Sequence, residues 1–112
     1  MKYVDMHCDT IGEIHERQKK GENISLRESS LHIDLNKLKK GDCGLQNFGL
    51  FVHLGREDQP FRCCAKMIDT FYQEIEKNKE LIWPVTSYRA VSYTHLIGAA
   101  VKLDFRFCGG PC

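Results

Sequence analysis

The segment Lys2–Thr10 reads KYVDMHCDT and joins a short strand pattern to the start of a helix pattern. Side chains two residues apart in a strand point to the same face, so we expect His7 and Asp9 to project together. Thr10 follows as the candidate N-cap of a helix, with Glu13 three residues later as in a capping box. The segment therefore predicts a strand with a polar carboxyl end, followed at once by a capped helix.

This strand end carries the chemistry of a candidate metal site. An imidazole and a carboxylate on one face can occupy two positions around a divalent cation, and both are ligand types that zinc accepts. Asp5 is expected to point the same way as His7 and Asp9, one strand pair earlier. Metal ligands at the carboxyl end of a first strand are typical of barrel hydrolases. The alternative is a solvated His and Asp at a strand end, because a His-x-Asp pattern is only three residues long.

The elements that follow predict an α/β fold. Their order is strand, helix, loop, helix, strand, helix and the approach to a further strand. A complete (β/α)8 barrel takes roughly 250 residues, so this chain has room for the N-terminal portion of one, truncated to two or three βα units. The expected elements are a strand over 2–9, a helix over 11–20 that stops at Gly21, a loop over 22–33, a helix over 35–40 with Asp34 as N-cap and Gly41 as its end, a strand over 44–53 in which Gln46 shares a face with Phe48, a helix over 61–80 and a strand start at Trp83–Val85.

Two blocks of the sequence resemble a known family. Met1–Thr10, MKYVDMHCDT, is similar to the opening of the membrane (renal) dipeptidase family of zinc-dependent dipeptidases. Leu31–Phe51, LHIDLNKLKKGDCGLQNFGLF, resembles the next block of that family, and Phe71–Val85, FYQEIEKNKELIWPV, is compatible with the helix and strand that come after it. The resemblance covers residues 1–90 and implies a partial dipeptidase barrel domain.

The resemblance also implies an activity. Members of the family hydrolyse dipeptides at a pair of zinc ions, with metal-bound water as the nucleophile. His7 and Asp9 match the ligand pair of one of the two zincs. No position here matches the bridging glutamate, the histidines of the second zinc or the acid/base aspartate, and the glutamates of the 61–80 helix are not assigned to the bridging role. Because a catalytic zinc usually has three protein ligands, we expect this chain by itself to be inactive.

Three other groups have side chains that could act as metal ligands. His32 and Asp34 repeat the His-x-Asp pattern. Asp34 suits a helix N-cap, however, so His32 is expected to be a loop residue. His53 lies at the carboxyl end of the second predicted strand and is either an exposed strand-end residue or one that supports the ligands. Cys108 and Cys112 bracket Gly-Gly-Pro near the C-terminus, and two thiolates without partners make a poor zinc site.

Composition excludes several function classes. The 112 residues include 16 basic and 15 acidic side chains, for a net charge of +1, and no basic stripe indicates nucleic-acid binding. No apolar segment is long enough for a membrane span, and the polar first strand does not make a signal peptide, so we expect a cytoplasmic protein. Without a secretory signal, the six cysteines do not predict disulfides.

The pattern changes near residue 90. Val91–Leu96, VSYTHL, has no counterpart in the family and resembles a translated transposase end sequence of the kind left by sequencing-library preparation. Residues 91–112 are therefore expected to lie outside the domain, as a disordered or artefactual tail. Ile97–Val101 is a stretch of the tail whose composition would suit a strand.

Two other function classes remain open. One is a different metal-dependent amidohydrolase of the same barrel type. The other is a small non-enzymatic module that binds a metal or a partner through its apolar faces. A partial barrel exposes sheet edge and apolar helix faces, which also allows association of copies of the chain into a homo-oligomer.

Overall fold

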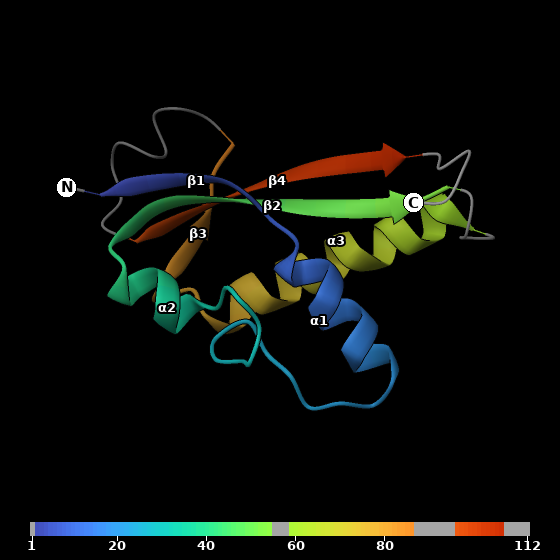
Figure 1. The fold of residues 1–112 in the computed structure, drawn as a ribbon, viewed down its shortest axis with the longest axis horizontal. Coiled ribbons are helices and arrows are strands. Elements are labelled where there is room, and N and C mark those ends of the chain that lie inside the picture. The colour runs from blue at the N-terminus through green and yellow to red at the C-terminus, as the bar shows by residue number, and fades with distance from the viewer. Residues whose placement is uncertain (1, 55–58, 87–95, 107–112) are drawn as a thin grey trace.

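The structure is a computed structural model that describes residues 2–54, 59–86 and 96–106, with the backbone alone for His53 and residues 104–106. Strands and helices alternate along most of the described chain (Figure 1). In chain order the elements are β1 (Tyr3–Cys8), α1 (Thr10–Lys19), α2 (Leu35–Lys40), β2 (Cys43–His53), α3 (Pro60–Lys77), β3 (Ile82–Pro84) and β4 (Ile97–Arg106).

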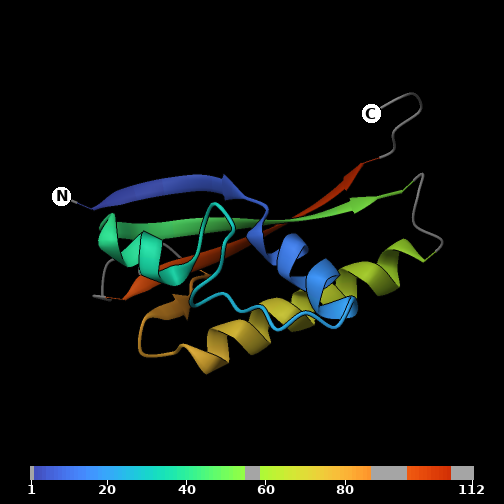
Figure 2. The same ribbon diagram turned by 60° about the horizontal axis from the view of Figure 1, so that its bottom comes forward.

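The strands form one four-stranded sheet in the order β1-β2-β4-β3, and all three pairings are parallel. The prediction of an α/β fold is confirmed. All three helices lie on one face of the sheet, as Figures 1 and 2 show together. Successive units of a barrel wall would place β3 beside β2, whereas here β4 lies between them. Within the described residues, no helix is long and apolar enough to cross a membrane.

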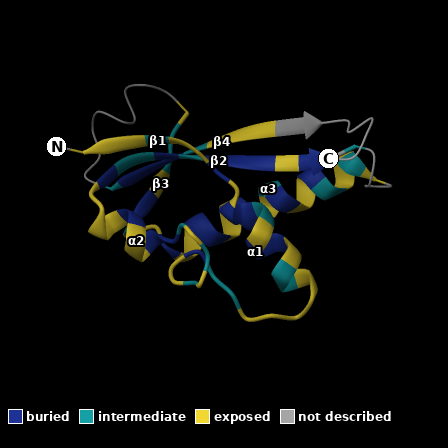
Figure 3. Ribbon diagram, in the orientation of Figure 1, coloured by how far each residue is buried: buried dark blue, intermediate teal, exposed yellow. Residues whose placement is uncertain are grey.

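The core lies between the sheet and the helices (Figure 3). Alternate side chains of β2, among them Phe48 and Leu50, are fully buried on the helix side. Phe71 of α3 packs edge-on against Phe48, with ring centroids 5.6 Å apart. The apolar stripe predicted for this helix is confirmed at its centre, where Met67, Phe71 and Ile75 are buried. Burial of such side chains is worth about 1.5–3 kcal/mol each and fixes which face of the sheet is covered.

The two short helices begin at different kinds of cap. The Asp34 carboxylate accepts a hydrogen bond from the Lys37 amide at 2.8 Å, which confirms Asp34 as the N-cap of α2. The expected cap of α1 is wrong: the N-cap is Asp9, without a side-chain cap bond, and Thr10 is already helical. The Thr10 hydroxyl instead donates to the Ile33 carbonyl at 3.3 Å. This bond ties the start of α1 to the loop before α2.

Residues 97–106 depart from the expectation of a disordered tail. They form β4, which pairs with β2 along its length and with β3 on its other side. Small and apolar residues at the start of β4 allow this central position, with Ile97 and Ala99 buried against the core. Residues 91–95 and 107–112, including Cys108 and Cys112, lie outside the described part of the chain.

Candidate metal-binding site

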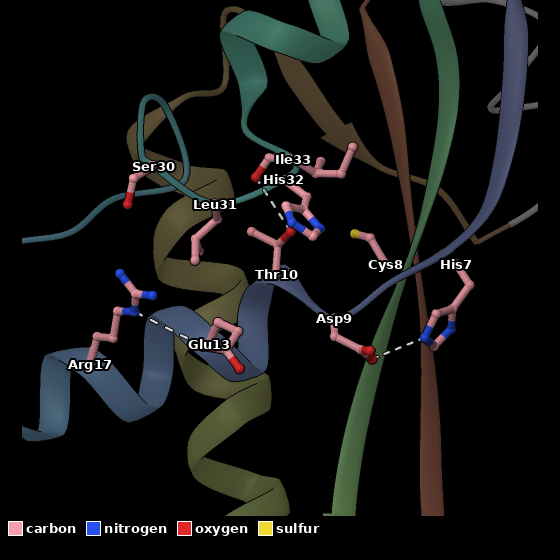
Figure 4. Close-up of a pocket in the computed structure, with 10 residues that line it drawn as sticks. All are labelled: His7, Cys8, Asp9, Thr10, Glu13, Arg17, Ser30, Leu31, His32 and Ile33. Atoms are coloured by element: carbon pink, nitrogen blue, oxygen red, sulfur yellow. Dashed lines mark hydrogen bonds and ion pairs between the residues drawn. The ribbon is translucent and has the colours of Figure 1, made fainter.

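The predicted ligand pair lies where β1 ends and α1 begins. A pocket of about 630 Å³ opens there, walled by the end of β1, the first turns of α1 and loop residues 30–33 (Figure 4). Arg17 closes its far side and lies 3.9 Å from the Glu13 carboxylate. The pocket is therefore built by the β1–α1 junction together with the loop that precedes α2.

His7 and Asp9 lie in direct contact at the mouth of this pocket. Nε2 of His7 is 2.9 Å from Oδ1 of Asp9, and the side chains are 54% and 67% exposed (Figure 4). Two ligand atoms that share a tetrahedral zinc are about 3.4 Å apart at the usual coordination distances. A small outward rotation of either side chain would admit an ion. The carboxylate is turned toward the imidazole, which explains why Asp9 does not cap α1.

Asp5 does not share the face of His7, contrary to the expectation from strict alternation. Asp5 is opposite Gln46 and Cys8 is opposite Phe48, so three residues of β1 match two of β2. The irregularity between Asp5 and Cys8 acts as a β-bulge and reverses the alternation. The Asp5 carboxylate instead accepts a hydrogen bond from the backbone amide of His7 at 3.2 Å. Asp5 thus supports the backbone of the pair rather than adding a ligand.

The His7 ring lies over β2 at a glycine. A Cβ atom on Gly49 would overlap Cε1 of the His7 ring and lie 2.9 Å from its Nδ1, closer than real contacts allow. Gly49 faces away from the helices, because its neighbours Phe48 and Leu50 point into the core. The missing side chain therefore provides the space that the imidazole occupies. A glycine inside a strand is the sequence signal that predicts such a close approach.

His32 lines the same pocket, whereas Asp34, the second residue of its His-x-Asp pattern, does not. Asp34 is buried and accepts hydrogen bonds from the amides of Ser29 and Lys37 at 3.0 and 2.8 Å, so its carboxylate is committed to the loop and helix. His32 is exposed and lines the pocket with His7 and Asp9 (Figure 4). No three His, Cys, Asp or Glu side chains among the described residues are grouped closely enough to hold a metal ion.

The remaining candidates from the sequence have other surroundings. Gln46 is buried on the face of Phe48, as predicted, and its amide donates to the Asn47 carbonyl at 3.1 Å. The side chain of His53 lies outside the described part. Cys8 lines the pocket, and burial raises the pKa of its thiol, an effect only partly offset by hydrogen bonding at Thr10. Three buried cysteines of the described residues are free thiols: Cys8, Cys43 and Cys64.

Comparisons with known proteins identify no family for this chain, so the function is argued from its residues alone. No protein-family model matches the chain, and no curated protein matches it.

Proposed function

We propose that this chain carries part of the zinc site of a dipeptidase of the membrane dipeptidase type, with residues 1–90 forming the first βα units of a (β/α)8 barrel. A parallel sheet covered by helices on one face resembles a barrel wall, because doubly wound sheets have helices on both faces, whereas the strand order, with β4 between β2 and β3, departs from that of a barrel. The observation that carries the proposal is the 2.9 Å approach of His7 and Asp9 at the carboxyl end of β1. A cytoplasmic location belongs to the same proposal.

The donor set suits zinc but does not complete its coordination. His7 supplies one imidazole nitrogen and Asp9 one carboxylate oxygen, and both are exposed enough to turn toward an ion. A bound zinc supplies Lewis acidity, which polarises a peptide carbonyl and makes water a better nucleophile. A catalytic zinc usually has three protein ligands, so the pair forms a partial site. We therefore expect cation binding by this chain and no dipeptide hydrolysis.

Calorimetric titration with zinc tests the pair directly. We expect one weak site in the unaltered chain, and at least about a tenfold loss of affinity in both His7→Ala and Asp9→Ala, because each substitution removes one of two ligands. His32→Ala is the matched control, since it removes another exposed imidazole from the same pocket. Zinc affinity that is unchanged in His7→Ala, or that falls equally in His32→Ala, contradicts the proposal.

Activity provides a separate test of the partial site. Incubation of the unaltered chain with zinc and glycylglycine is expected to release no glycine above the level of a zinc-only blank. Turnover that depends on zinc and is lost in His7→Ala would show that the chain forms a complete site, and the expectation of inactivity would then be wrong.

A further inference from the structure

The outer edge of β4 has no strand partner over its second half. β3 pairs with β4 only from Ile97 to Ala99, whereas β2 accompanies β4 as far as Arg106. Beyond Ala99, no strand of the described residues lies on the side of β4 that faces away from β2 (Figure 2). An open edge presents backbone N–H and C=O groups that can pair with another strand. Residues 100–106 therefore form an exposed sheet edge, which we call the β4 edge.

The backbone groups of every second residue point outward from the β4 edge. The Ala99 carbonyl accepts a hydrogen bond from the Val85 amide at 2.8 Å, so the backbone groups of Ala99 are directed toward the β3 side. Along a strand in a sheet, consecutive residues direct their backbone groups to alternate sides. The groups of Val101 and Leu103 therefore point to the same side as those of Ala99, at a level where β3 has already ended. A strand added to this edge would form its hydrogen bonds with these residues.

The side chains of the β4 edge alternate between apolar and charged, as the sequence AVKLDFR over 100–106 shows. Val101 and Leu103 lie on the helix side, in register with two buried residues of β2, but they are themselves 37% and 45% exposed. Lys102 is exposed on the opposite face, and Asp104 follows at the next register position on that face. An apolar stripe on an unprotected sheet edge is typical of a site for strand pairing.

We propose that the β4 edge pairs antiparallel with the β4 edge of a second copy of this chain, with the two Leu103 residues opposite each other. In this register the two Leu103 residues exchange both of their backbone hydrogen bonds. Val101 of each copy is opposite Phe105 of the other, so apolar residues meet on the helix side. Lys102 of each copy is opposite Asp104 of the other, so each dimer contains the ion pair twice. The interface is isologous and therefore closes at two copies.

Charge selects this register among those that the backbone allows. Because only every second residue directs its backbone groups outward, the two strands can shift only in steps of two residues. A shift in one direction places Lys102 opposite its own copy. A shift in the other direction places Asp104 opposite its own copy and Lys102 opposite Arg106. Like charges directly opposite each other destabilise a strand pair, so the register centred on Leu103 is favoured over both neighbours.

Sedimentation equilibrium over a range of protein concentrations tests the pairing. We expect the unaltered chain to form a dimer, and Lys102→Asp or Asp104→Lys to weaken self-association at least about tenfold, because each variant replaces both ion pairs by like charges. The double variant Lys102→Asp/Asp104→Lys should dimerise like the unaltered chain, since it exchanges the two charges and keeps their complementarity. Lys40→Asp, at an exposed lysine of α2, is the matched control and should leave the dimer unchanged.

A mixture of the two single variants separates a charge effect from a loss of folding. Each single variant has the charges that complement the other, so an equal mixture should form a heterodimer although neither variant self-associates. A chain that stays monomeric without substitution overturns the inference. So does a Lys102→Asp variant that associates as tightly as the unaltered chain, or a failure of both the double variant and the mixture to dimerise when circular dichroism shows them folded.

Discussion

The imidazole of His7 occupies the space that a side chain on Gly49 would fill. His7 comes from the edge strand β1 and Gly49 from β2 beside it, and a Cβ on Gly49 would lie 2.9 Å from Nδ1 of His7. The ring can therefore lie over the sheet because Gly49 has no side chain. This placement keeps Nε2 of His7 in contact with Asp9.

Gly49→Ala is expected to separate the stability of the fold from the geometry of the site. The His7 side chain is 54% exposed, so the added methyl group can push the ring toward solvent with little strain. The free energy of unfolding should change by less than about 1 kcal/mol, whereas zinc affinity should fall at least about tenfold. Urea unfolding and zinc titration measure the two effects. Unchanged zinc affinity would show that the position of the His7 ring over Gly49 does not matter for zinc binding.

Much of the helix side of the fold could be predicted from local patterns. The apolar run that became β2, the stripe on α3 and the Asp34 cap each depend on residues close together in the sequence. The prediction that α1 stops at Gly21 is confirmed: the helix ends at Lys19, and Gly21 has a φ of +86°, a conformation that glycine adopts freely.

The arrangement of the site could be predicted only in part, because the rest depends on pairing between distant segments. The contact of His7 with Asp9 follows from their spacing. The bulge that removes Asp5 from that face appears only when β1 is aligned with β2. The pairing of β4 with β2 likewise depends on a register that no local pattern in residues 97–106 encodes. Strand register is set by tertiary packing and cannot be predicted from either strand alone.

Gly12→Ala is expected to stabilise the protein without affecting zinc binding. Gly12 lies in α1, and a Cβ there would meet only Sδ of Met67, at 4.0 Å, which is an ordinary van der Waals contact. Replacing a glycine within a helix by alanine is worth about 0.5–1 kcal/mol. A higher urea midpoint with unchanged zinc affinity is the expected result, and it makes this variant the control for Gly49→Ala. A lower midpoint would mean that α1 packs more tightly against α3 than the structure indicates.

Glu74→Ala is expected to destabilise the fold through the loop that walls the pocket. Glu74 is 1% exposed, and its carboxylate accepts hydrogen bonds from the Leu26 amide at 2.6 Å and from Lys77 at 3.0 Å. Removing it leaves the Leu26 amide buried without a partner, which costs about 1–3 kcal/mol. These two bonds engage the Glu74 carboxylate within the fold, away from any metal.

Glu76→Ala provides the comparison for Glu74 on the same helix. Glu76 is exposed and forms a salt bridge with Lys79 at 3.2 Å, an arrangement that contributes only about 0.2–1 kcal/mol. Urea unfolding of both variants should therefore show a larger loss for Glu74→Ala. Equal losses would mean that the loop over residues 22–33 does not depend on the buried carboxylate.

Stability is expected to fall at alkaline pH because buried thiols resist ionisation. Burial raises the pKa of Cys64 above its ordinary value of 9.0, and burial is also the largest cause of the raised pKa of Cys43. The unfolded chain loses these protons first, so the contribution is fully present below about pH 9 and is lost as the pH rises through the pKa of the folded state. Urea unfolding from pH 7 to 10 should show a decline that begins near pH 9 and is smaller in Cys64→Ala. An identical decline in that variant would place the alkaline sensitivity in other groups.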